Sequence, residues 1–82
     1  MENFIYVYIL QSLSDPRRHY TGMTDDLEQR LRKHNEGGVP HTAKHRPWHI
    51  RTATAFHDRQ RASAFEQYLK THSGRVFAAR HF

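Results

Sequence analysis

The sequence contains no cysteine among its 82 residues. This absence excludes disulfide bonds and any thiolate zinc site, which are the two usual supports of very small domains. Glycine and proline are few, at four and three residues, and no segment is repeated or of low complexity. A chain of this length has room for one domain around one hydrophobic core. We therefore expect residues 1–82 to form a single domain that packing alone holds together.

Long hydrophobic runs are missing as well. The most apolar segment, residues 4–10, follows Glu2 rather than a basic segment. A membrane-spanning helix needs about 20 apolar residues, and a secretory signal begins with a positively charged region. The sequence therefore predicts a soluble, cytoplasmic protein without a membrane partner.

Acidic residues are scarce relative to basic ones. Eight Asp and Glu residues stand against 13 Lys and Arg residues, which gives a net charge of +5 at pH 7. A positive field attracts polyanions and raises their encounter rate, so nucleic acid is the leading candidate partner. Because the surplus of positive charge falls after residue 24, we expect the later two-thirds of the chain to carry this attraction.

Three segments have the composition of β-strands. Residues 4–10 (FIYVYIL) are β-branched or aromatic on both alternating faces, a pattern typical of a central strand that is covered on both sides. Turn-forming Ser, Asp and Pro residues separate this segment from a second extended one at residues 19–23, which predicts a hairpin with a longish loop. Residues 50–56 alternate weakly and are predicted to form a third strand.

A first helix is predicted over residues 26–36. Thr24 or Asp25 can cap it, and Glu28 stands three residues after Asp25 in a capping-box-like arrangement. The glycine pair that begins at Gly37 is the expected end of this helix.

The second half of the chain contains a loop and one or two more helices. Residues 39–48 lack periodicity and are predicted to form a loop. Asp58 is the predicted cap of a second helix that runs to about Ser73, with Gly74 in the C-terminal stop position, and a short last helix is predicted over residues 75–80. The element order β-β-α-β-α-(α) predicts an α+β fold, in which a small three-stranded antiparallel sheet is flanked by helices.

Two polar residues lie on the apolar face of the first predicted helix. With about 3.6 residues per turn, Leu27 and Leu31 define the face that points to the sheet. Arg30 and His34 fall on the same side. A guanidinium and an imidazole are therefore directed toward the interior.

The second predicted helix repeats this anomaly with a carboxylate. Ala62, Phe65 and Leu69 define its inward face, and Glu66 lies among them. Burying a charged group costs several kcal/mol unless it is paired or hydrogen-bonded. An inward Arg and an inward Glu therefore indicate either an ion pair or a functional site.

Tyrosines on the strands complete the unusual set. Tyr6 and Tyr8 share a face of the first strand, and the hairpin can bring Tyr20 beside them. The alternative is purely structural: Arg30 and Glu66 form a salt bridge, and the tyrosines are core rings with their hydroxyls in water.

The tyrosines also belong to two short motifs. Tyr6-Val7-Tyr8 followed by Ile9-Leu10, and then Tyr20-Thr21-Gly22, resemble the GIY and YIG segments that name a nuclease family. The resemblance continues with Arg30 eight residues after that glycine, His34 one turn later, Asn35, Gly37, and Glu66 on the second helix. It covers nearly the whole chain and is greatest to the compact stand-alone members.

The chain departs from the family pattern in several places. An aromatic residue stands where the first family glycine would be, and Thr21 replaces the middle residue of the second tripeptide. No Asn follows Asn35, although members often have one after the glutamate helix; Ser73 and His81 are the candidates to replace it. This difference leaves open a second hypothesis, a catalytically weak or inactive nucleic-acid-binding module of the same fold.

The resemblance implies the GIY-YIG endonuclease fold and a metal-dependent endonuclease that hydrolyses phosphodiester bonds. The substrate would be nucleic acid, with DNA favoured over RNA, and the role would lie in DNA repair or recombination. By the same resemblance, Glu66 would hold one Mg²⁺ or Mn²⁺ ion, a hard cation that prefers carboxylate and water ligands. Arg30 would clamp a phosphate oxygen.

The resemblance also implies that Tyr8 orients or deprotonates the attacking water, with Tyr20 and His34 in support. A phenol has an ordinary pKa of about 10, so this role requires the metal and Arg30 to favour the phenolate. Tyr6, two positions earlier on the same face, is the alternative for Tyr8.

Substrate-binding residues are predicted in two places. One is Gly22 in the second tripeptide, and the other is the basic stretch 39–48, where Lys44 and Arg46 could hold a phosphate backbone. Trp48 could stack on an unpaired base, but we expect it to be a core anchor.

Overall fold

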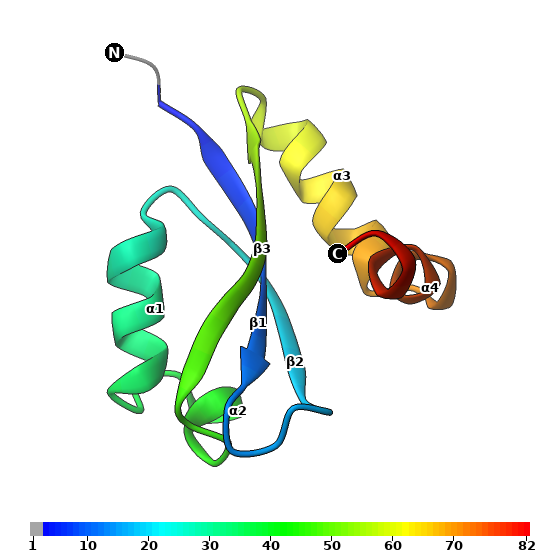
Figure 1. The fold of residues 1–82 in the computed structure, drawn as a ribbon. Helices are drawn as coiled ribbons and strands as arrows, with labels where there is room; N and C mark the ends of the chain where they lie inside the picture. Colours follow the sequence, from blue (N-terminus) through cyan, green and yellow to red (C-terminus); the bar gives the residue numbers. More distant parts are fainter. Residues whose placement is uncertain (1–2) are drawn as a thin grey trace.

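The apolar segment near the N-terminus forms the central strand of a three-stranded sheet. The computed structural model describes residues 3–82. Strand β1 (Ile5–Ser12) lies between β2 (His19–Thr24) and β3 (Trp48–Phe56), and it pairs with both in the antiparallel sense. The predicted central strand and hairpin are confirmed (Figure 1).

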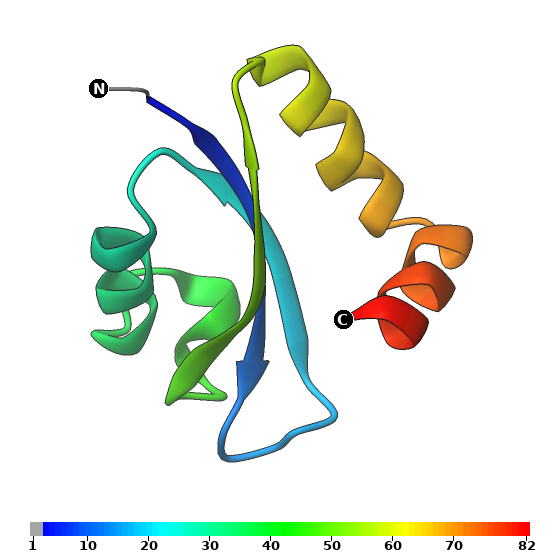
Figure 2. The ribbon, with the colours of Figure 1, turned by 45° about the horizontal axis from the view of Figure 1, so that its top comes forward.

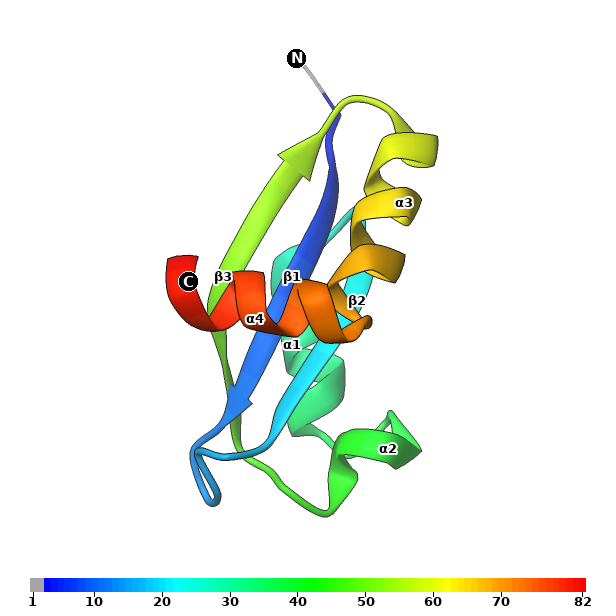
Figure 3. The same ribbon diagram turned by 90° about the vertical axis from the view of Figure 1, so that its right-hand side faces the viewer.

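Helices cover both faces of this sheet. One face carries α1 (Leu27–Asn35) and the short α2 (Pro40–Ala43), and the other carries α3 (Arg59–Leu69) and α4 (His72–His81) (Figures 1 and 2). Figure 3 shows α4 running across the strands. The α+β class is confirmed, with the order β-β-α-α-β-α-α. None of the helices within residues 3–82 is long and apolar enough to cross a membrane.

The alternating side chains of β1 divide the core into two layers. Val7 and Ile9 are buried against the α3 side together with Ala62 and Leu69. Tyr8 and Leu10 point to the α1 side, where Trp48 joins them. Each layer buries one of the two apolar faces that the sequence predicts for this strand.

A β-bulge in β3 changes which face its side chains occupy. In the pairing with β1, Leu10 is opposite Ile50 while Ile9 is opposite Thr52, so Arg51 is an extra residue. Ile50 packs in the α1-side layer, whereas Phe56 packs in the α3-side layer. A bulge of this kind bends a strand and redirects side chains, which explains why this strand alternates only weakly in the sequence.

The first helix begins one residue later than predicted. The N-cap is Asp26, whose carboxylate accepts a hydrogen bond from the N–H of Gln29 at 3.1 Å. The prediction of Thr24 or Asp25 was wrong because Thr24 is still the last paired residue of β2, where it lies opposite Tyr6. The helix ends as predicted before Gly37, which has a positive φ of 83°.

Two predictions for the later chain were also wrong. The stretch predicted as a loop contains α2, which begins with a proline in its first turn, where a missing N–H is tolerated. The second long helix ends at Leu69, and Gly74 lies inside α4 rather than at a helix end. Thr71 caps this new helix by accepting from the N–H of Gly74. A Cβ on Gly74 would collide with the carbonyl oxygen of Tyr68, so the glycine permits close approach.

Candidate active site

Tyr8 is the buried tyrosine of the first strand, and it contacts His34. Only 2% of Tyr8 is exposed, and its hydroxyl lies 3.0 Å from Nε2 of the fully buried His34. Tyr6 is half-buried, and its ring lies beside that of Phe4 instead. Of the two tyrosines of β1, Tyr8 is therefore the one that forms a hydrogen bond with a residue of α1.

The hydrogen bonds around His34 assign its neutral form. Nδ1 lies 2.8 Å from the Thr42 hydroxyl, and that hydroxyl donates its only hydrogen to the carbonyl oxygen of Val39. With its hydrogen directed to Val39, the Thr42 oxygen accepts from Nδ1–H, which is the tautomer that satisfies all three groups. Nε2 is then left as an acceptor, so the Tyr8 hydroxyl donates to it. The four-residue helix α2 thus orients the imidazole through the hydrogen bond of Thr42 to Nδ1.

Burial dominates the ionisation of both groups. Burial raises the pKa of Tyr8 to about 12, the neighbouring Tyr20 adds to the rise, and the charge and hydrogen bonding of Arg30 offset part of it. The pKa of His34 is lowered, first by burial and then by the charges of Arg30 and Lys33. The pair is therefore an un-ionised phenol that faces a neutral imidazole. The expected bias of Tyr8 toward phenolate is not present in the protein alone, because burial outweighs Arg30.

Gly22 makes room for the Tyr8 hydroxyl. It lies directly opposite Tyr8 in the β1–β2 register and is buried. A Cβ at this position would stand 2.5 Å from the hydroxyl oxygen and 3.1 Å from a ring carbon of Tyr20. The first approach is closer than real Cβ atoms show and the second is tighter than most, so a side chain at this position would displace the Tyr8 hydroxyl.

Arg30 and Tyr20 border the same group. The ring of Tyr20 lies 5.0 Å from that of His34 and 6.5 Å from that of Tyr8, measured between centroids. Arg30 is half-buried, one turn before His34 on α1, and acts on the Tyr8 hydroxyl through charge and hydrogen bonding. The structure therefore brings together the predicted phenols, imidazole and guanidinium on the α1 side of the sheet.

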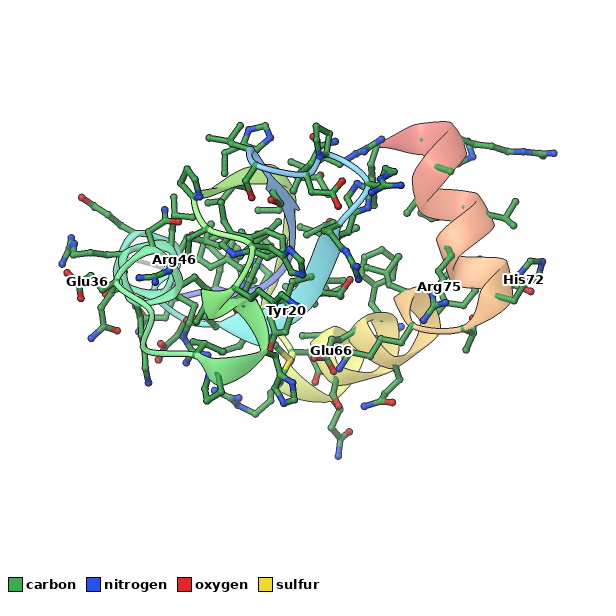
Figure 4. The ribbon with its side chains drawn as sticks, turned by 90° about the horizontal axis from the view of Figure 1, so that it is seen from below. Tyr20, Glu36, Arg46, Glu66, His72 and Arg75 are labelled. Carbon is green, nitrogen blue, oxygen red and sulfur yellow. The ribbon has the colours of Figure 1, made fainter. Side chains whose placement is uncertain are left out.

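Glu66 approaches from the opposite layer. It lies on the sheet-facing side of α3, and only 15% of its side chain is exposed. Its charge contributes to the raised pKa of Tyr8, which shows that the carboxylate acts on the same phenol. In Figure 4, Tyr20 and Glu66 lie at the middle of the view, between α1 and the α3–α4 pair.

Glu66 forms its ion pair with Lys70, at 3.2 Å, one turn later on α3. Within residues 3–82, no ion pair joins Glu66 to Arg30. The purely structural alternative, in which these two charges neutralise each other, is therefore wrong. Neither of these two charges is neutralised by the other.

The donor set around Glu66 fits a hard divalent cation that keeps most of its water. Residues 3–82 contain no group of three or more His, Cys, Asp or Glu side chains that could enclose a metal ion. Mg²⁺ is commonly held by one or two carboxylates, with water and substrate phosphate as the other ligands. A single, mostly covered carboxylate is compatible with that mode and not with a closed protein cage.

The residues predicted in the basic stretch have different surroundings. The Nε of Arg46 donates to the carbonyl oxygen of Ala43 at 2.7 Å, and its guanidinium packs over Gly37. Lys44 is exposed at the end of α2. Trp48 is the expected core anchor, because it is buried and its indole N–H donates to the carbonyl oxygen of Thr42 at 2.8 Å.

Asn35, and the two residues proposed to replace the Asn that family members have after the glutamate helix, lie outside the group around Tyr8. Asn35 makes two hydrogen bonds to the backbone of Trp48, which tie the end of α1 to the start of β3. His81 packs its ring against Phe77, and Ser73 is exposed on α4.

Sequence reasoning missed two residues of the site. Thr42 orients His34 but lies in a stretch that was predicted to be a loop. Lys70 pairs with Glu66, and the i, i+4 spacing of the two residues on the second helix was the available signal.

Sequence comparison with known proteins finds a family match and several relatives. The profile of the GIY-YIG catalytic domain matches residues 4–79. A UPF0213 protein of Haloquadratum walsbyi is 32% identical over 74 residues, which cover 89% of this chain and 81% of the relative. A second UPF0213 protein, from Clostridium perfringens, is 35% identical over 66 residues, with coverages of 79% and 69%.

A third relative is a much longer protein. The structure-specific endonuclease subunit SLX1 of Candida dubliniensis is 48% identical over 52 residues, which are 56% of this chain and 18% of the yeast protein. The match thus spans less than a fifth of that relative. No solved structure matches the chain.

Proposed function

Because the chain belongs to the GIY-YIG catalytic domain family, we propose that it is a divalent-metal-dependent endonuclease that hydrolyses phosphodiester bonds in nucleic acid, with DNA as the preferred substrate. The observation that carries the proposal is the convergence of Tyr8, Arg30 and His34 from one layer with Glu66 from the other. Endonuclease activity is supported by the yeast relative, which is named as a structure-specific endonuclease subunit. A role in repair or recombination and a cytoplasmic location remain predictions.

Phosphodiester hydrolysis requires charge neutralisation at the phosphoryl oxygens and a correctly placed nucleophile. Glu66 would hold a Mg²⁺ or Mn²⁺ ion, which when bound would act as a Lewis acid on the phosphate. Arg30 would bind a non-bridging oxygen, because its planar fork suits phosphate. Its place one turn before His34 puts this positive charge at the Tyr8 hydroxyl.

Tyr8 and His34 supply a route for the proton of the attacking water. The Tyr8 oxygen would accept a proton from water while its own hydroxyl proton moves to Nε2 of His34. The neutral tautomer of His34, set by Thr42, leaves this nitrogen free to accept. The transfer avoids a free phenolate, which a pKa of about 12 disfavours near neutral pH. Two residues together would thus act as the general base.

Plasmid nicking in the presence of Mg²⁺ or Mn²⁺ tests this proposal. Wild-type protein is expected to cut, and EDTA is expected to abolish cutting. Glu66→Gln and Tyr8→Phe should each reduce the rate by a factor of about 10² or more, in the range found for loss of a general base or a transition-state contact. The matched controls are Glu28→Gln and Tyr68→Phe, which change an exposed carboxylate and an exposed tyrosine.

The result that would overturn the proposal is the absence of cutting on linear, branched, single-stranded and RNA substrates alike. Salt-sensitive binding without cutting would favour the alternative, an inactive binding module of the same fold. Equal rates for Glu66→Gln and Glu28→Gln would also count against the assigned site.

A further inference from the structure

A basic groove lies on the α4 side of the sheet, outside the group of residues described above. Its volume is about 600 Å³. The apolar part of its lining includes Ile9 of β1, Leu69 of α3, and Ala78 of α4. The lining residues therefore come from the sheet and from the two C-terminal helices, of which α4 crosses the strands in Figure 3.

Five cationic side chains also line this basic groove, and no Asp or Glu of residues 3–82 is among its lining residues. They come from the β1–β2 loop, the bulge of β3, the end of α3 and the start of α4: Arg17, Arg18, Arg51, Lys70 and Arg75. Residues 1–24 have no net charge, yet Arg17 and Arg18 of this part line the groove. Asp15, the acidic residue beside them, pairs with both but is not itself among the residues that line the groove.

The existing contacts of these cations are of a kind that a phosphate can replace. Arg17 and Arg18 share the single carboxylate of Asp15, at 3.0 and 3.7 Å, and exposed ion pairs of this type contribute little to stability. Arg51 donates to the carbonyl oxygen of Phe82 at 2.8 Å and lies 3.0 Å from Nε2 of His19. The groove therefore has more positive charge than its surroundings neutralise.

The basic groove shares Tyr20 with the candidate active site and borders Glu66 through Lys70. Tyr20, whose ring lies beside His34, also lines the groove. Lys70 lines the groove while its ammonium group pairs with Glu66 at 3.2 Å. A chain of phosphates that passes Glu66 can thus continue directly into the groove.

We propose that the basic groove binds an unpaired nucleic-acid strand next to the phosphodiester that is cut, so that the preferred substrate is a duplex with a single-stranded branch or tail. This inference rests on the proposed function and adds a substrate class to it. The groove has the volume of a small-ligand pocket and is far too small for a double helix. An apolar lining with a cationic rim suits exposed bases and their phosphates.

Fluorescence anisotropy in EDTA measures the proposed binding without cleavage. The probes are a labelled blunt duplex and the same duplex with a single-stranded tail, made with either deoxyribose or ribose in the tail. We expect the tailed duplex to bind about 10-fold more tightly than the blunt one. The tail that gives the higher affinity, deoxyribose or ribose, would show whether the groove prefers a DNA or an RNA strand.

The main variant is Arg17→Gln/Arg75→Gln, and its matched control is Arg59→Gln/Arg80→Gln, which removes the same charge from exposed positions outside the groove. The groove variant should lose about 10-fold in affinity for the tailed duplex. The slope of its log affinity against log salt concentration should decrease in magnitude by about 1.4, because each phosphate contact to a single strand contributes about 0.7 to this slope. The control should retain most of the preference for the tail.

A second pair of variants tests the groove without removing a cation. Ala79→Glu adds a carboxylate to the lining of the groove, and Ala64→Glu adds the same group at an exposed position on α3 outside it. Both positions are exposed in helices, so both variants should fold. Only Ala79→Glu is expected to abolish the preference for the tail.

Two results would overturn the inference: equal affinity of the wild-type protein for blunt and tailed duplexes, or equal losses in the groove variants and their controls. These results can be separated from failure of the proposed function. Cleavage with no effect of the groove variants would refute the groove alone. Tail binding through the groove without cleavage in Mg²⁺ would refute the nuclease alone.

Discussion

The hydroxyl of Tyr8 is held 3.0 Å from Nε2 of His34 by a set of contacts from three parts of the chain. The strand pair places Tyr8 over Gly22, α1 supplies His34, and α2 supplies the Thr42 hydroxyl that selects the tautomer. His34 is fully buried, so loss of the Tyr8 hydroxyl leaves Nε2 of His34 without a hydrogen-bond partner. This bond is therefore a structural contact as well as the centre of the proposed proton route.

Tyr8→Phe should lower the free energy of unfolding by about 1–3 kcal/mol, because Nε2 of His34 would be left buried and unsatisfied. Urea denaturation measures this change, and Tyr68→Phe should shift stability by less than about 0.5 kcal/mol. In a His34→Ala background, Tyr8→Phe should lower the free energy of unfolding by about 0.5–3 kcal/mol less than it does in the wild-type protein. Additive effects of the two substitutions would contradict a direct Tyr8–His34 interaction.

Acid should weaken the fold through His34. Its pKa is lowered in the folded protein, so below an unfolded value of about 6.5 the unfolded chain binds the proton more readily. The stability that neutral His34 contributes is therefore complete above about pH 6.5 and is lost as the pH falls from there toward the lower folded pKa. Denaturation midpoints at pH 7.5 and 5.0 should differ less for His34→Gln than for wild type. The exposed His72→Gln variant should keep the wild-type difference.

Gly22→Ala should disturb the site more than other glycine substitutions do. The new Cβ would stand 2.5 Å from the Tyr8 hydroxyl, and overpacking of this kind costs about 1–3 kcal/mol. A shift of the reacting group by about 1 Å can cost about 10²-fold in rate, so cleavage should fall with stability. Gly38→Ala is the control, because its nearest neighbour is the flexible Lys33 side chain at 3.0 Å. Similar nicking rates for the two variants would refute the close approach.

Lys70→Met should strengthen the binding of Mn²⁺ to the free protein. Lys70 pairs with Glu66 at 3.2 Å and is half exposed, and such a pair is worth about 0.2–1 kcal/mol, which corresponds to an increase of about 1.5–5-fold in affinity. Isothermal titration with Mn²⁺ alone separates this effect from nucleic-acid binding. Lys33→Met, an exposed substitution on α1, should leave the affinity unchanged. An unchanged or weaker affinity for Lys70→Met would show that the ammonium group does not compete for Glu66.

The secondary structure near the motifs was largely predictable from local pattern. The two-sided apolar run predicted β1 as the central strand, and the 3.6-residue period predicted that His34 and Glu66 face inward. These features depend on neighbours within a few residues. Segment ends were less predictable: Thr24 stayed in the sheet rather than capping α1, and Gly74 proved to be a point of close packing rather than a helix end.

The partners of the site residues were not predictable in the same way. Thr42 is eight residues from His34 in sequence and meets it only because α2 folds back under α1. The choice between Tyr6 and Tyr8 depended on which ring the opposing helix would contact. The cations of the basic groove come from four separated segments of the chain. Two of these cations, Arg17 and Arg18, lie in a part of the chain that has no net charge.

The amino-acid sequence by itself determined the elements, their apolar faces and the presence of polar groups on those faces, because periodicity follows from local backbone geometry. Only the tertiary structure decided that Glu66 pairs with Lys70 rather than Arg30, that His34 is neutral beneath Tyr8, and that Arg17 and Arg75 line one groove. These relationships depend on strand register, a bulge and the crossing of helices, which bring together side chains that are remote in the chain.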